Sequence, residues 1–407
     1  MPWKTVLGGL VLVIVPVAYF WNDVCYWQAN ENLTRRNHLA AENWVARSSW
    51  FGHEADSRTS LLRLRIARRK GDFREVEHQL KQAEKYGVPE SELRRQRWLA
   101  MAQTNQFDLM QAHWDKLLQN ARDDGPEIAR AYYTWAMLHH NYDLALQTLE
   151  SWHQDFPRDP EPLKLKGLYF QAKTDWEGAE KAFQNAFIMA PDNDEIRLLL
   201  ANALQVRLKT KEAIPHFQQY LRRHPDDLSA VRGLAESMAN AGNVNDAIAV
   251  LKEALKKSPD DFMLLKACGE LLLSSGDVSA AAILLEKAYR AVPEHANLAN
   301  SLARAWKGCG RNDEAAPLFA FVAESQPKLA EMELLEKQLR GDPNNLDLRM
   351  KIAGIVAQYV SRRDAIRWYE NLLIIAPNYR PAHQNLVDLY RFFGNNEKAD
   401  YHASYLE

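Results

Sequence analysis

The sequence is poor in cysteine and nearly balanced in charge, and each of these shortages excludes a class of protein. Its 407 residues include three cysteines, an odd number and too few for a disulfide scaffold. Lys and Arg total 51 against 53 for Asp and Glu, which gives a net charge of −2. Nucleic-acid-binding chains usually carry a large basic excess, so we expect no nucleic-acid partner.

Motifs of catalysis and cofactor binding are also missing. The sequence contains no phosphate-binding loop, no Gly-x-Gly-x-x-Gly after a strand, and no strand-rich region. Among the scattered histidines, His383 and His402 are expected to fall on the two helices of one hairpin, but no carboxylate lies at helical spacing from them. We therefore expect no catalytic residue, no cofactor and no metal site, and thus not an enzyme.

One long apolar run is present, close to the N-terminus. After a short tail of residues 1–4, residues 5–21 read TVLGGLVLVIVPVAYFW and carry no charge. A helix of this length reaches roughly 25 Å, near the lower limit for crossing a membrane. Aromatic residues flank or end the run, as in interfacial belts: Trp3, Tyr19, Phe20, Trp21, Tyr26 and Trp27. We predict a single transmembrane anchor; a cleaved signal peptide is the alternative.

The charges around this run determine its orientation only weakly. Lys4 and the amino group precede it, and Arg35 and Arg36 follow it against two acidic residues. Because very short N-terminal tails most often stay in the cytoplasm, we expect a single-pass membrane protein with the bulk of the chain extracytoplasmic. Residues 22–56 are predicted to be a juxtamembrane linker or a degenerate helical region.

A period of 34 residues runs through most of the remaining chain. Prolines recur at this interval: Pro157, Pro191, Pro225, Pro259, Pro293 and Pro327. Twelve residues before each proline stands an alanine: Ala145, Ala179, Ala213, Ala247, Ala281 and Ala315. Small residues stand twelve residues further upstream: Gly167, Ala201, Ala235, Gly269 and Ala303. The pattern predicts pairs of amphipathic helices that pack closely at the small positions, with proline ending each repeat.

This pattern resembles the tetratricopeptide repeat (TPR) family over about residues 57–407. The stretch 163–191 matches best, through Gly167, Phe170, Ala179, Phe183, Ala186 and Pro191. The resemblance implies an all-α helix-turn-helix solenoid, wound as a right-handed superhelix and here preceded by one transmembrane helix. Departures occur at Arg63, Arg97 and Lys166, where the family carries leucine.

The period breaks once, between Ala315 and Ala365. The extra segment carries apolar residues at helical spacing: Leu329, Met332, Leu335 and Leu339. We therefore predict about eight repeats over 57–327, an inserted helix over 328–343, and the last two repeats over 344–407. The inserted helix is either an ordinary insertion or a hinge or partner surface.

Each end of the repeat region carries a feature with two interpretations. The stretch from Arg58 to Arg74 is rich in arginine and is expected to form a solvated helical face; the alternative is contact with lipid headgroups or an acidic partner. At the C-terminal end, Tyr401, Tyr405 and Leu406 follow the last alanine slot without a polar capping helix. This end either frays or supports a homo-oligomer.

The resemblance also places the binding surface. In the TPR family the first helix of each repeat lines a concave groove through its fifth and ninth positions. The candidate protein-binding residues at these positions are Arg130, Lys164, Asn202, Arg232, Lys266, Asn300 and Arg304. Lys at the fifth position with Asn at the ninth, the pair that clamps a peptide carboxylate, occurs in no repeat. The cations either hold an acidic segment or pair with Glu236 and Glu270 on their own helices.

Taken together, these features predict a non-catalytic, membrane-tethered scaffold for protein–protein interactions in the assembly of an envelope complex. A self-associating structural subunit of an envelope assembly is one alternative. An accessory subunit of a membrane-bound enzyme or secretion system is the other.

Overall fold

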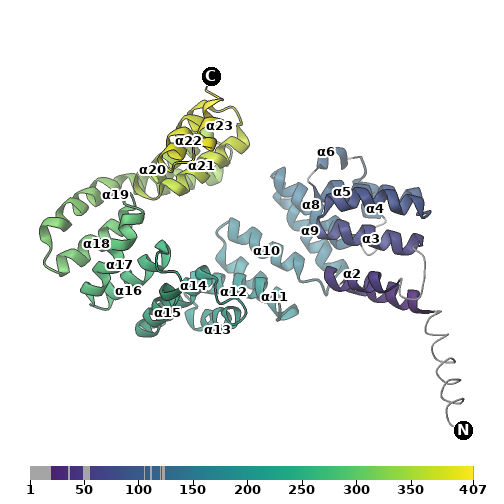
Figure 1. Cartoon of the computed structure of the whole chain (residues 1–407), viewed down its shortest axis with the longest axis horizontal. Coiled ribbons are helices and arrows are strands. Elements are labelled where there is room, and N and C mark those ends of the chain that lie inside the picture. The colour runs from purple at the N-terminus through teal and green to yellow at the C-terminus, as the bar shows by residue number, and fades with distance from the viewer. Residues whose placement is uncertain are drawn as a thin grey trace, which may run out of the picture. The chain divides into compact units, whose positions relative to one another are not determined.

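A computed structural model describes residues 20–34, 37–48, 56–104, 106–110, 112–119, 121 and 124–406, and helices form all the regular structure of these residues (Figure 1). Residues 1–4 and most of the predicted anchor, 5–19, lie outside the described residues. No described helix combines the length and the apolar sequence that crossing a bilayer requires. The chain divides into two compact units, Met1–Ala190 (unit 1) and Pro191–Glu407 (unit 2).

Unit 1 begins with a helix over residues 20–34, which we call helix 20–34. It continues with α2 (His38–Arg47), α3 (Ser57–Lys70), α4 (Phe73–Lys85), α5 (Glu90–Gln103), α6 (Phe107–Met110), α7 (Trp114–Gln119), α8 (Gly125–Leu138), α9 (Tyr142–Asp155), α10 (Glu161–Ala172) and α11 (Trp176–Met189). Unit 2 contains α12 (Asp194–Val206), α13 (Thr210–Leu221), α14 (Leu228–Asn240), α15 (Val244–Lys257), α16 (Phe262–Ser274), α17 (Val278–Ala291), α18 (Ala296–Gly308), α19 (Asn312–Gly341), α20 (Leu346–Tyr359), α21 (Arg362–Ile375), α22 (Arg380–Phe392) and α23 (Asn396–Ala403).

Consecutive helices pack as hairpins, for example α10 with α11 and α16 with α17. The small residue of the first helix faces a large apolar residue of the second. A Cβ at Gly167 would overlap the ring of Phe183, and a Cβ at Gly269 would lie 2.7 Å from Cγ of Leu285. The small positions therefore act as predicted, because they let the two helices of a hairpin approach closely.

The turn inside each hairpin also repeats every 34 residues. The second residue after the first helix has a positive φ at six successive positions: His140, Thr174, Leu208, Gly242, Gly276 and Gly310. In this left-handed conformation the backbone closes the helix end; the amide of Asp175, for example, donates to the carbonyl oxygen of Phe170. Three of the six positions carry side chains that the left-handed conformation disfavours.

One hairpin departs from the rule. Where other repeats have a continuous second helix, the chain after α5 forms the two short helices α6 and α7. Met110 fills the slot that alanine fills elsewhere and is fully buried, and Trp114 follows it into the core. In this region α5 also packs directly against α8.

The predicted inserted helix over 328–343 is not a separate element. It forms the second half of α19, which runs unbroken from Asn312 to Gly341 through Pro327. Leu318 and Val322 pack in the core of α14 to α18, whereas Leu335 packs with α20 to α23. Burial of these apolar side chains on both sides of the proline compensates for the loss of the backbone hydrogen bond that the proline removes.

The region predicted as a juxtamembrane linker is folded where it is described. Helix 20–34 and α2 form a hairpin that packs against α3. The contact buries Ala29 and Leu33 of the first helix, Ala41 and Val45 of α2, and Leu62 and Ile66 of α3. This hairpin adds a helical pair to unit 1 ahead of the first predicted repeat.

Candidate protein-binding surface

The first helices of successive repeats in unit 2 pack side by side, in the order α12, α14, α16, α18. Five of the predicted binding residues lie on them: Asn202, Arg232, Lys266, Asn300 and Arg304. We call these five residues the first-helix row. Hydrogen bonds join neighbouring helices beside it: Gln205 donates to Glu236 at 2.7 Å, and Ser301 donates to Glu270 at 3.2 Å. Sequence reasoning missed Gln205 and Ser301, because an uncharged side chain outside the fifth and ninth positions gives no signal.

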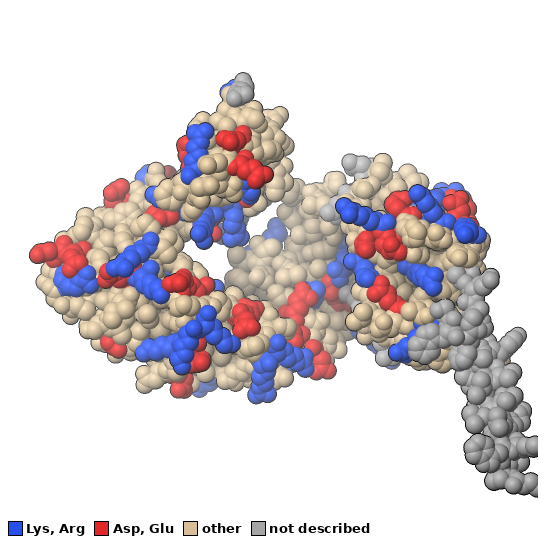
Figure 2. Space-filling model, viewed as in Figure 1, with Lys and Arg blue, Asp and Glu red and all other residues tan. Residues whose placement is uncertain are grey.

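The cations of the first-helix row differ in their pairing. Lys266 Nζ lies 3.5 Å from Glu270 Oε2 on the same helix, as the i,i+4 spacing allows. Arg232 and Arg304 form no ion pair with any described residue. Lys/Arg and Asp/Glu side chains are interspersed on the visible face of each unit (Figure 2), so charge of one sign does not dominate that face. The row thus offers two guanidinium groups that are available to an external carboxylate.

The two predicted residues in unit 1 are already engaged. Arg130 of α8 and Lys164 of α10 both pair with Glu161, the first residue of α10, and the Lys164 Nζ to Glu161 Oε2 distance is 3.1 Å. The side chain of Lys164 is only 11% exposed. Arg130 thus links α8 to α10, whereas Lys164 pairs within α10, and both cations already have an internal partner.

The arginine-rich stretch forms a solvated face only in part: Arg58, Lys70 and Arg74 are exposed as expected, whereas three other arginines turn inward. Arg65, Arg68 and Arg69 of α3 turn toward Asp124 at the start of α8, and Arg95 of α5 joins them. The side chain of Arg68 is fully buried, with Nη2 3.2 Å from Asp124 Oδ1 and Nε donating to Gln96 at 2.8 Å. We call these four arginines, with Asp124 and Glu127, the arginine cluster.

Electrostatics within the arginine cluster favour the ionised form of Asp124. Burial by itself would raise the pKa of Asp124, but Arg68, Arg65, Arg95 and Arg69 outweigh it and hold that pKa below its usual value. Burial lowers the pKa of Arg69, against the opposing attraction of Glu127. Buried charges are tolerated only when they are paired and hydrogen-bonded in this way, so the cluster is a connected ionic core.

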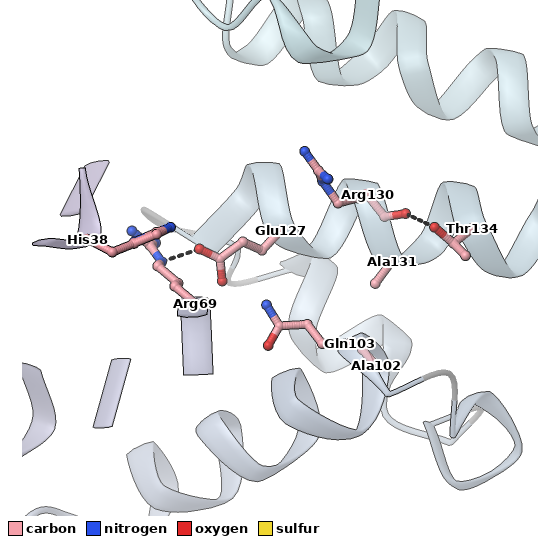
Figure 3. Close-up of a pocket in the computed structure, with 8 residues that line it drawn as sticks. All are labelled: His38, Arg69, Ala102, Gln103, Glu127, Arg130, Ala131 and Thr134. Carbon is pink, nitrogen blue, oxygen red and sulfur yellow. Dashed lines mark hydrogen bonds and ion pairs between the residues drawn. The ribbon is translucent and has the colours of Figure 1, made fainter. Parts of the chain in front are cut away.

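A cavity of about 280 Å³ lies beside the arginine cluster, between α2, α3, α5 and α8. Figure 3 shows its lining, in which Arg69 reaches Glu127 and Thr134 donates to the carbonyl oxygen of Arg130 at 2.9 Å. Arg130 in turn pairs with Glu161. Because its charged groups already bind one another, we assign this cavity to the internal network of unit 1.

His383 and His402 meet, as their positions predicted. Their Nδ1 atoms lie 3.0 Å apart, and both side chains are buried. His383 Nε2 lies 2.8 Å from the carbonyl oxygen of Pro377, so it carries the proton and Nδ1 accepts from His402. No group of three or more His, Cys, Asp or Glu side chains is placed to hold a metal ion within the described ranges.

Comparison with known proteins identifies the repeats. Residues 198–262 and 267–330 match the family model described as tetratricopeptide repeat. The chain therefore contains tetratricopeptide repeats within an all-α array of helix-turn-helix repeats. Arrays of this kind are protein–protein interaction scaffolds and are typically non-catalytic. No curated protein matches the chain.

Several solved structures are similar to the chain at low sequence identity. MamA (residues 41 to the end) from Desulfovibrio magneticus RS-1 is 19% identical, covering 41% of this chain and 94% of its own, with a TM-score of 0.39. A TPR protein from Parabacteroides merdae ATCC 43184 is 16% identical, covering 60% and 90%, with a TM-score of 0.37. PilW, described as a widely conserved type IV pilus biogenesis factor, is 20% identical, covering 50% and 92%, with a TM-score of 0.42.

Proposed function

We propose that this chain is a membrane-tethered, non-catalytic scaffold in the assembly of an envelope complex, and that it binds an acidic segment of a partner protein on the first-helix row. The TPR array is the interaction scaffold. The proposal adds the tether, the surface, the charge of the bound segment and the extracytoplasmic setting.

The proposed binding surface is supported by the position of Arg232 and Arg304 and by their lack of an ion pair among the described residues. They lie on α14 and α18, with Lys266 on α16 between them, and neither arginine has an internal ion pair among the described residues. Packed helices lie about 8–10 Å apart, and an extended chain advances about 3.3 Å per residue. An extended partner with an acidic residue at every third position therefore meets successive helices, and arginine binds each carboxylate with two hydrogen bonds.

Charge reversal tests this surface. After crosslinking in native membranes identifies the partner, its affinity is measured for the Arg232→Glu/Arg304→Glu double variant. Repulsion replaces two attractions, so binding is expected to weaken at least about tenfold, on the order of 1.4 kcal/mol. Lys252→Glu is the matched control, since Lys252 is an exposed cation on the second helix α15. Equal affinity of the double variant and the native chain would exclude the first-helix row.

The tether is supported by the uncharged run of residues 5–21. Full-length protein is expected to float with membranes through an alkaline carbonate wash, which strips peripheral proteins. A chain that begins at residue 20 is expected to be released. Retention of the shortened chain after the wash would contradict a sole N-terminal anchor.

Self-association is a second candidate function, favoured by aromatic side chains exposed at the C-terminal end. Phe392 of α22 is 62% exposed and Tyr401 of α23 is 58% exposed. Light scattering of the full chain in detergent distinguishes the two functions. A concentration-dependent dimer that Phe392→Ser and Tyr401→Ser abolish would favour self-association, whereas a monomer at high concentration would exclude it.

A further inference from the structure

Helix 20–34 is apolar on two opposite faces. Cys25, Ala29 and Leu33 are fully buried against α2 and α3. Phe20, Val24 and Trp27 are 56%, 42% and 60% exposed. At about 100° per residue these two sets point in nearly opposite directions around the helix. One apolar face suffices for a helix packed on the surface of a soluble unit, so the exposed face needs a second apolar environment.

The direction of this exposed face is fixed by contacts with the rest of unit 1. Arg58 Nη2 lies 2.7 Å from Asp23 Oδ1, and Trp21 Nε1 donates to the carbonyl oxygen of Arg47 at 2.9 Å. Arg69 donates to the carbonyl oxygen of Leu33 at 2.9 Å, near the other end of the helix. Helix 20–34 and unit 1 therefore present the face as one body.

The sequence preceding the helix indicates what covers this face. Phe20 and Trp21 are the last two residues of the uncharged run 5–21, so helix 20–34 includes the end of that run. With a rise of about 1.5 Å per residue, Val24 lies roughly 5 Å and Trp27 roughly 9 Å beyond Trp21 along the helix. The polar layer on each side of the hydrocarbon is about 5–8 Å deep, and tryptophan favours this layer. A helix inclined by up to about 40° to the bilayer normal brings Trp27 to a depth of about 7 Å, within the layer.

We propose that the face formed by Phe20, Val24 and Trp27 lies in the headgroup layer of a bilayer and thereby fixes the orientation of unit 1 on the membrane surface. The occupant of the face is lipid, not a second copy of the chain or another protein. This inference rests on the membrane tether proposed above, and it adds that unit 1 contacts the bilayer directly instead of hanging from a free linker.

The experiment measures depth in the full chain, reconstituted in vesicles that contain a fixed fraction of brominated phosphatidylcholine. A bimane label is attached at Trp27→Cys in a Cys309→Ser background, because Cys25 and Cys268 are buried and Cys309 is exposed. Leu39→Cys is the matched control, since Leu39 on α2 is 70% exposed and lies outside the proposed face. Quenching at position 27 is expected to exceed that at position 39 at least threefold. A second label at Val24→Cys is expected to be quenched at least as strongly as the label at position 27.

Flotation of the same samples separates the two proposals. Labelled protein that does not float with the vesicles overturns the tether. Protein that floats but shows equal quenching at positions 27 and 39 overturns the lipid contact and leaves the tether standing. Crosslinking of two unlabelled Trp27→Cys chains through residue 27 in the same vesicles also overturns the lipid contact, because it assigns the face to a dimer.

Discussion

Units 1 and 2 use the same hairpin repeat but stabilise it with different interiors. In unit 2 the core of α14 to α18 is built from alanine, leucine and other apolar side chains at the repeating slots. In unit 1 the helices α3, α5 and α8 meet around the arginine cluster, where Arg68, Gln96 and Asp124 are buried. The difference coincides with the broken second helix after α5. Where the alanine slot holds Met110 and α5 packs directly against α8, buried ion pairs lie beside the apolar cluster that Leu99 of α5 forms with Ile128 of α8.

This comparison shows that the 34-residue pattern specifies a spacing of helices and leaves open what fills the space between them. When a side chain in an apolar core is shortened, the loss of stability grows with the volume of the cavity that is left. A core of buried ion pairs is stable only when every charge keeps its partner. The two units are therefore expected to respond differently to equally conservative substitutions.

The largest expected effect is in unit 1. Asp124→Asn removes the carboxylate that four arginines share, so it leaves buried guanidinium groups uncompensated at a cost of about 3–5 kcal/mol. Hydrogen exchange during urea unfolding measures the loss in each unit separately. Asp260→Asn in unit 2 is the control, because Asp260 is 83% exposed and pairs with Lys287 at the surface; its cost is expected to stay below about 1 kcal/mol. Equal costs would abolish the distinction between the two interiors.

The same carboxylate gives unit 1 a dependence on pH. The pKa of Asp124 is lowered in the folded protein, so its contribution to stability is present above the unfolded value of about 4 and is lost as pH falls through the folded pKa. The native chain is therefore expected to lose more of its unit 1 stability below pH 4 than Asp124→Asn does. Parallel acid titrations of the two proteins, followed by circular dichroism, check this difference.

A smaller effect is expected where both units use the small slot. Gly167→Ala places a Cβ into the ring of Phe183 and is expected to destabilise unit 1 by about 1–3 kcal/mol. Gly354→Ala in α20 is the matched control, because its Cβ would meet no atom within 4 Å. Removing a flexible helical glycine there is expected to stabilise unit 2 by about 0.5–1 kcal/mol. Thermal unfolding measures both, and a shift of the same sign would show that close approach does not govern the slot.

The smallest effect tests the turns, which the two units share. Thr174 in unit 1 and Leu208 in unit 2 both have a φ of 58° at the same position of the repeat. Glycine relieves the strain of the left-handed backbone, although it also raises the entropy of the unfolded chain. Thr174→Gly and Leu208→Gly are each expected to raise the free energy of unfolding by about 0.5–1 kcal/mol. Gly242→Ala, at the same position of the next repeat, is expected to lower the free energy of unfolding by a similar amount. Gains that differ between the units would mean that their turns also differ.

The sequence predicted the hairpins well, because their periodic residues carry the packing. The spacing from Pro157 to Pro327, with Gly167 and Ala179 as examples of the small slots, indicates hairpins that the structure forms. It predicted α19 less well, because Pro327 normally ends a helix and only the distant contacts of Leu335 keep this one continuous.

The candidate residues lie on the first helices of their hairpins, as the sequence predicts, but their ion pairs were only partly predictable. Lys266 and Glu270 stand at a spacing that signals their contact, whereas Arg130 pairs with Glu161 on the next first helix, which no i,i+4 rule indicates. The arginine cluster was invisible for the same reason. Arg68 finds Asp124 56 residues further along the chain, so the residues around Arg68 read as a solvated helical face.

Helix α19 has a consequence for how unit 2 comes apart. In a simple repeat array each hairpin melts against its nearest neighbours, so an end loses one repeat at a time. Here a single helix of 30 residues contributes Leu318 to one core and Leu335 to the next. Tyr359 also donates to Glu324 at 3.0 Å, and the amide of Arg362 donates to Glu294 at 3.0 Å. Helices α20 to α23 are thus linked cooperatively to α18 through one continuous backbone, and the C-terminal end is built to open as a block.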